Sequence, residues 1–146
     1  MKDIVKQALK IAKKAHKGQM RNDGVTPYIS HPIAVADNIV RNYHPTVVND
    51  AVIATALLHD VIEDCAVTYK DLVDRGIPEY IVKSVWALTH HKDTPYLTYI
   101  LAVKMDTKAR LVKVEDIKHN LSTLENTKKN KHQRDKYLLA IYILEH

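Results

Sequence analysis

The chain has 146 residues, of which 46% are hydrophobic and 27% are charged, as is usual for one soluble globular domain. Its 3 glycines and 5 prolines exclude a collagen-like or low-complexity chain, and no apolar run approaches the ~18–20 residues of a membrane span. The 22 Lys and Arg outnumber the 17 Asp and Glu, and the net charge of +5 suits anionic partners such as nucleotides, phosphate esters or nucleic acid.

Helical periodicity begins near the N-terminus and predicts a first helix. Its apolar face repeats at intervals of three and four residues, and it comprises Ile4, Ala8, Ile11, Ala12 and Ala15. This basic segment has no continuous apolar stretch, so we expect no signal peptide. Gly18 ends the pattern, and the polar composition of residues 18–30 predicts a loop. His31-Pro32 then opens a second helix, because proline is tolerated in the first helical turn.

The strongly apolar run AVIATALLHDVIED, which follows Asn49 and ends at Asp64, predicts a central helix buried on several sides. Thr68 and Asp71 have the spacing of a capping box, so a short helix should follow. Further helices are expected over residues 79–91, from Pro95 onward, over 109–124 and over 135–146, with a basic connection at 126–134. No segment alternates as a β-strand would. The sequence therefore predicts an all-α fold, a single compact domain over residues 1–146 with about seven or eight helices.

Four ionisable residues lie within two turns of the expected central helix. His59 and Asp60 are surrounded by apolar residues, and Glu63 and Asp64 each follow one of them by four positions. Such groups are costly to bury without a partner, and a divalent cation would supply one. The alternative is a solvated helix face that pairs with the many lysines.

Two further segments carry residues of the same chemical type. His31 lies at a predicted helix start, and Asp116 lies among apolar residues in VKVEDIKHN. A polar stripe along this segment comprises Lys113, Asp116, Asn120 and Thr123. His31 and Asp116, together with His59 and Asp60, make two imidazoles and two carboxylates, a set that suits Mn²⁺ or Fe²⁺ better than structural zinc. A water activated by such an ion is the nucleophile that phosphoester hydrolysis needs.

Three segments resemble a known family. AHKGQMRNDGVTPYISHPIAVA, ALLHDVIEDCAVT and LVKVEDIKHNLSTL are similar, in this order, to motifs of the HD-domain phosphohydrolase superfamily. Within it they resemble the hydrolase domain of the RelA/SpoT family, and especially its small stand-alone alarmone hydrolases. The resemblance covers nearly the whole chain and implies a helical HD-domain fold. It also implies Mn²⁺-dependent removal of the 3′-pyrophosphate from ppGpp, which yields GDP and pyrophosphate.

The resemblance also implies roles for particular residues. The positions that match the metal ligands, usually of Mn²⁺, are His31, His59, Asp60 and Asp116. Glu63 and Asp64 match an acidic pair that activates water and transfers protons. The positions that match substrate-binding residues are Arg21, Asn120 and Thr123. The chain departs from the common pattern at Asn22, where a lysine is usual, and at Glu115, where a small apolar residue is usual.

Two alternatives to the alarmone hydrolase remain open from the sequence. One is an HD-domain phosphohydrolase of another nucleotide or phosphate ester, and the other is a metal-free helical module that binds nucleic acid. No basic recognition helix is visible, so we expect a small nucleotide as the partner rather than nucleic acid or a membrane, and a homo-oligomer is possible. Cys65 is the single cysteine, which excludes an internal disulfide and favours a reducing cytoplasmic location.

Overall fold

The computed structural model describes residues 3–146, which form nine helices. The helices are α1 (Asp3–Ala15), α2 (Ser30–Asn42), α3 (Asp50–Leu58), α4 (Val61–Asp64), α5 (Tyr69–Asp74), α6 (Glu79–Ala87), α7 (Tyr96–Lys104), α8 (Thr107–Thr123) and α9 (Lys131–Glu145). This part of the chain contains no strand, and a single isolated antiparallel bridge joins Met20 to Pro27. The predicted all-α fold class is therefore confirmed.

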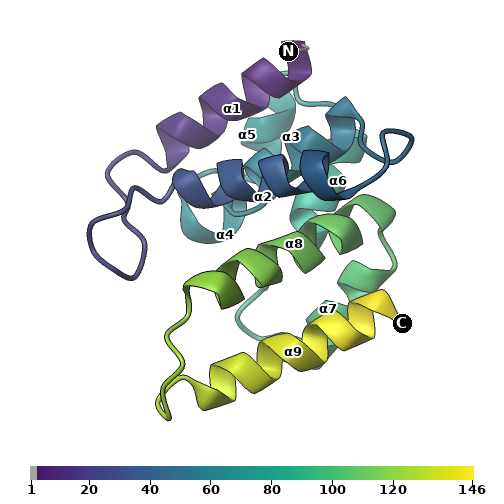
Figure 1. Ribbon diagram of the computed structural model, residues 1–146. Coiled ribbons are helices and arrows are strands. Elements are labelled where there is room, and N and C mark those ends of the chain that lie inside the picture. Colours follow the sequence, from purple (N-terminus) through teal and green to yellow (C-terminus); the bar gives the residue numbers. More distant parts are fainter. Residues whose placement is uncertain (1–2) are drawn as a thin grey trace.

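Helix α3 lies at the centre of the fold because its residues are apolar on all sides. It packs against α1, α2, α6 and α8, and most of its side chains are buried. Leu58 is completely buried, and burial of a leucine side chain contributes roughly 1.5–3 kcal/mol. The helices α7 and α9 pack on each other, and both also pack on α8. Figure 1 shows α2, α8 and α9 one below another.

The predicted central helix is wrong in one respect, because it is interrupted at His59-Asp60. Helix α3 ends at Leu58 and the short α4 begins at Val61. The ring Nδ1 of His59 donates to the main-chain oxygen of Ala56 at 2.6 Å. This carbonyl is the acceptor that a continuing helix would offer to the Asp60 N–H. The break adds one helix to the predicted number and directs both side chains into the core.

Two other predicted boundaries are also wrong. Helix α6 ends at Ala87 rather than near His91, and the Tyr99 hydroxyl donates to the Leu88 carbonyl just beyond its end. Helix α9 begins at Lys131, inside the segment predicted as a connection. Lys, Gln and Arg all favour helix, and Lys131 pairs with Asp135 one turn later at 2.5 Å.

Most local signals of the sequence are confirmed. Thr68 and Asp71 form the complete capping box at the start of α5. Gly18 follows α1 with a φ of 84°, a left-handed conformation that glycine adopts without strain. Pro32 lies in the first turn of α2, and Pro95 directly precedes α7. Among residues 3–146, none of the helices is both long enough and apolar enough to cross a membrane.

Candidate metal centre

The fold brings together the four residues that the sequence predicts as metal ligands. His31 lies in the first turn of α2, His59 and Asp60 lie at the break between α3 and α4, and Asp116 lies in the middle of α8. Each offers one ligand atom, and these atoms all lie within 4.8 Å of one another. All four side chains are buried. Their role as metal ligands remains a prediction, but the geometry that it requires is present.

The imidazoles and carboxylates face each other through defined atoms. The Nε2 of His31 lies 2.7 Å from Asp116 Oδ1, and the Nε2 of His59 lies 3.3 Å from the same oxygen. Asp60 Oδ2 lies 3.0 Å from His59 Nε2 and 3.8 Å from His31 Nε2. Both histidines therefore present the same ring nitrogen to the two carboxylates.

Asp116 is held by contacts on both of its oxygens. Lys113, one turn earlier on α8, places its Nζ 2.9 Å from Oδ2, and this ammonium also lies over the ring of Tyr99. Asn120, one turn later, donates to Oδ1 at 3.3 Å. The ammonium leaves Oδ1 as the oxygen that faces the histidines. The polar stripe predicted on this helix thus orients a carboxylate of the cluster.

Asp60 has a partner that the sequence analysis did not identify. The hydroxyl of Tyr28, from the loop before α2, donates to Asp60 Oδ2 at 2.5 Å and lies 3.5 Å from Asp64 Oδ2. Tyr28 lies in the segment PYIS, which was informative in the sequence only as part of a segment that resembles a family motif. Its position three residues before His31 was the one available signal, and it became informative only once the chain was folded.

The ionisable side chains of the cluster shift one another's pKa values. Burial by itself would lower the pKa of His59, but the adjacent Asp60 and Asp116 raise it well above its ordinary value. Burial would raise the pKa of Asp60, but His59 lowers it to about 2. Burial is likewise outweighed at Asp116, where Lys113 and His59 hold the pKa well below the usual range. Two ionised carboxylates therefore stay buried beside two imidazoles.

The donor set fits a divalent first-row cation. Its two carboxylate oxygens and two imidazole nitrogens are the mixture that Mn²⁺ or Fe²⁺ accepts, whereas structural zinc sites are dominated by Cys and His. Such a cation would offset the charge of two carboxylates that are less than one-tenth exposed. The side chains that would hold it are His31, His59, Asp60 and Asp116.

The predicted acidic pair lies at the edge of this cluster. Glu63, Asp64 and Asp60 offer carboxylate oxygens within 4.8 Å of one another, and both Glu63 and Asp64 are exposed to solvent. The main-chain N–H of His90 donates to Glu63 Oε1 at 2.6 Å. That N–H is available because α6 ends early. Although both side chains reach solvent, the protein around their carboxyl groups displaces part of the water and so raises the pKa of both acids, and the neighbouring Asp60 raises it further.

The three predicted substrate-binding residues contact one another directly. Arg21 donates through Nη2 to Asn120 Oδ1 and to Thr123 Oγ1, both at 3.1 Å, and so links the loop after α1 to the end of α8. The loop is held in shape because the N–H groups of Val25 and Thr26 both donate to Asp23 Oδ1 at 2.8 Å. The guanidinium is therefore carried on an ordered turn.

These residues line a cleft of about 500 Å³ beside the cluster. Much of the wall of this cleft was not predicted from the sequence, and it also includes Asn22, His119, Asn130, Gln133 and Tyr137. Asn130 and Gln133 lie in the segment predicted as a basic connection, and Tyr137 lies in the predicted last helix. His119 lies three residues after Asp116 on α8. The cleft and the cluster thus share a wall.

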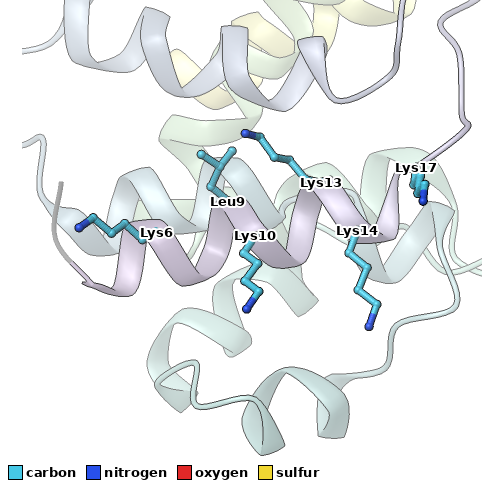
Figure 2. Close-up of a pocket in the computed structure, with 6 residues that line it drawn as sticks. All are labelled: Lys6, Leu9, Lys10, Lys13, Lys14 and Lys17. Carbon is cyan, nitrogen blue, oxygen red and sulfur yellow. The ribbon is translucent and has the colours of Figure 1, made fainter.

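A second hollow lies over the outer face of α1, and its lining differs chemically from that of the cleft. It is lined by Lys6, Leu9, Lys10, Lys13, Lys14 and Lys17. Figure 2 shows that Lys13 extends to one side of the helix, whereas Lys10 and Lys14 extend to the other. Because the ammonium groups diverge, they do not form a common binding point for one anion. We therefore place the candidate functional site at the cluster and its cleft.

A helical bundle with two histidines and two aspartates around one point defines a class of metal-binding domain. The chain belongs to the HD domain family, whose model matches residues 8–143. The resemblance predicted from the three motifs is confirmed at this level.

Known relatives share this domain. The bifunctional (p)ppGpp synthase/hydrolase SpoT of Escherichia coli K12 is 33% identical over 141 residues, which are 89% of this chain and 19% of SpoT. A guanosine-3′,5′-bis(diphosphate) 3′-pyrophosphohydrolase of Haemophilus influenzae is 38% identical over 144 residues, covering 90% of this chain and 20% of the relative. The chain thus spans about one-fifth of the length of these curated relatives.

A solved structure supports the same fold. It is described as a metazoan ortholog of SpoT that hydrolyses ppGpp and plays a role in starvation responses. It superposes with a TM-score of 0.75 at 22% sequence identity, covering 99% of this chain and 84% of that chain. At this identity the likeness establishes the fold, and the HD-domain architecture predicted from the sequence is confirmed.

Proposed function

We propose that residues 1–146 act as an HD-type metal-dependent phosphohydrolase domain that removes the 3′-pyrophosphate from guanosine alarmones, converting ppGpp to GDP and pyrophosphate. The observation that carries the proposal is the cluster of two buried imidazoles and two buried carboxylates beside an open cleft. The names of the curated relatives support the substrate class. We propose Mn²⁺ as the bound ion. We also propose that the protein is located in the cytoplasm, which suits a nucleotide substrate.

In this proposal each group of residues has a separate task. A bound divalent ion supplies Lewis-acid activation of water and of the phosphoryl group. Arg21 offers a forked donor to a phosphate or to the base, and Asn120 and Thr123 line the same side of the cleft. Glu63 and Asp64 lie close enough to the cluster for one carboxyl to accept the proton of the attacking water. The other carboxyl, in its protonated form, gives a proton to the leaving 3′ oxygen. The pair therefore gains one proton and loses one proton in each turnover.

A second candidate is the same chemistry on a less highly charged phosphate ester. Arg21 is the one lysine or arginine among the residues described as lining the cleft, and its neighbour Asn22 is uncharged. A guanosine alarmone carries phosphate groups at two positions, so a wall with a single cation favours a substrate with fewer charges.

The experiment that tests both candidates is a turnover assay with purified protein and Mn²⁺. The panel contains ppGpp, nucleoside mono-, di- and triphosphates, and simple phosphate monoesters. We expect ppGpp to yield GDP and pyrophosphate in equal amounts, with no product in EDTA. Turnover of another phosphoester with intact ppGpp would favour the second candidate. A panel without any turnover by Mn²⁺-loaded protein would contradict both.

A further inference from the structure

The two histidines of the cluster are held in different ways. His59 donates its Nδ1–H to the Ala56 carbonyl of its own helix at 2.6 Å. His31 has no such main-chain partner among the contacts of its ring: its Nδ1 lies 2.7 Å from Nδ1 of His119, a side chain of α8. On its Nδ1 side, the ring of His31 is thus held by one side chain, which also lines the cleft.

The chemistry of metal binding decides which of these two nitrogens carries the hydrogen. Nε2 of His31 faces the carboxylates, 2.7 Å from Asp116, so it is the nitrogen available to a cation. A metal-bound nitrogen must be without a proton, so the neutral ring carries its hydrogen on Nδ1. At 2.7 Å this N–H has His119 Nδ1 as its acceptor. The reverse arrangement would place a hydrogen on His31 Nε2, where the cation belongs.

We propose that His119 is the positioning residue for His31: its Nδ1 accepts the Nδ1–H of His31 and thereby presents Nε2 of His31 to the metal. The inference rests on the proposed metal centre and goes beyond its four ligands. His119 is suited to this task because it lies three residues after Asp116 on α8. One helix therefore supplies a ligand and the acceptor that orients a second ligand on α2.

The packing around His31 supports a fixed ring. Its ring lies 4.9 Å from that of His119, 5.2 Å from that of His59 and 5.7 Å from that of Tyr28, measured between centroids. The side chain of His31 is completely buried, so water has little access to replace the acceptor. Loss of His119 Nδ1 would leave a buried N–H unpaired or allow the ring to take its other tautomer.

The test measures metal binding, which does not depend on turnover. Mn²⁺ affinity of the metal-free protein is determined by titration calorimetry for the parent, His119→Leu and His119→Asn. Partners of this kind are typically worth about 10–100-fold in metal affinity, and we expect this loss for His119→Leu. His119→Asn should bind nearly as tightly as the parent, because Asn Oδ1 stands as far from Cβ as His Nδ1 and can accept the same hydrogen.

A spectroscopic measurement and a control complete the test. In Zn²⁺-loaded protein with ¹⁵N-labelled histidine, we expect a protected Nδ1–H signal of His31 in the parent and in His119→Asn, and its loss in His119→Leu. His132→Leu removes an exposed imidazole of α9 and should leave the affinity unchanged. Equal affinity of the parent and His119→Leu, or a folded His119→Asn that binds as weakly as His119→Leu, would overturn the inference. A parent without Mn²⁺ affinity would overturn the metal centre itself.

Discussion

Asp116 divides its two oxygens between different tasks. Oδ2 meets the ammonium of Lys113, and Oδ1 faces the two histidines. Lys113 thus keeps the carboxylate ionised and turned toward the centre of the cluster. Glu63 and Asp64 differ from the four buried residues because they are exposed, and Glu63 is anchored by a single main-chain donor. The four proposed metal ligands and the two proposed acid–base residues thus differ in burial.

The acidic pair allows binding to be distinguished from catalysis. We expect Glu63→Gln and Asp64→Asn to keep the fold and the Mn²⁺ content and to lose roughly 10²-fold or more in kcat, because acid–base assistance is typically worth ~10²–10⁴-fold. The glutamine retains the oxygen that accepts from His90. Steady-state kinetics with metal analysis provide the measurement. Near-parental kcat in both variants would mean that the pair only forms surface ion pairs.

At the scale of elements, the ends of helices create the site more than their middles do. The break between α3 and α4 presents His59 and Asp60, the first turn of α2 presents His31, and the early end of α6 frees the N–H of His90. Helix α5 packs against α6 and depends on its N-terminal cap, because it is only six residues long. Short helices of this kind form only with tertiary contacts and good caps.

The cap of α5 gives a quantitative expectation for stability. Thr68 Oγ1 accepts from the Asp71 N–H at 3.1 Å, and the Thr68 N–H donates to Asp71 Oδ2 at 2.9 Å. Replacement of Thr68 by alanine should lower the free energy of unfolding by about 1 kcal/mol, as measured by urea denaturation. Thr98→Ala, at an exposed position within α7, is the matched control and should change it little. Equal stabilities of the two variants would contradict the role of the cap.

At the scale of the whole molecule, the proposed metal would connect three helices that are distant in sequence. The ligands come from α2, from the end of α3 and from α8, which already pack against one another. The unfolded chain cannot hold these four groups around one ion. Binding energy at this site therefore becomes stability of the fold.

Metal removal tests this connection. With free Mn²⁺ at 100 times Kd, the free energy of unfolding should rise by about 2.7 kcal/mol. For a domain of this size, that corresponds to an increase in Tm of roughly 10 °C over the protein in EDTA. Asp60→Ala should abolish the increase, whereas Asp37→Ala, at an exposed position on α2, should preserve it. An Asp60→Ala protein with a full metal-dependent increase would exclude this residue as a ligand.

The sequence by itself was sufficient for the fold class, for most helix starts and for the four residues of the cluster. Helical periodicity reports which face is buried, and glycine, proline and the Thr68–Asp71 pair act locally, so their effects can be inferred without a structure. The four residues were accessible because the residue types are unusual in apolar surroundings and because the motifs resemble a known family. Their expected proximity agrees with the geometry.

Only the tertiary structure decided where helices break and which side chains orient the cluster. The break at His59 comes from a ring nitrogen that competes for a main-chain carbonyl, an effect that apolar periodicity does not reveal. The contacts of Tyr28 with Asp60 and of His119 with His31 join residues 32 and 88 positions apart. Such pairs depend on how α2, α3 and α8 pack, because a hydrogen bond requires a distance and a direction that spacing along the chain does not determine.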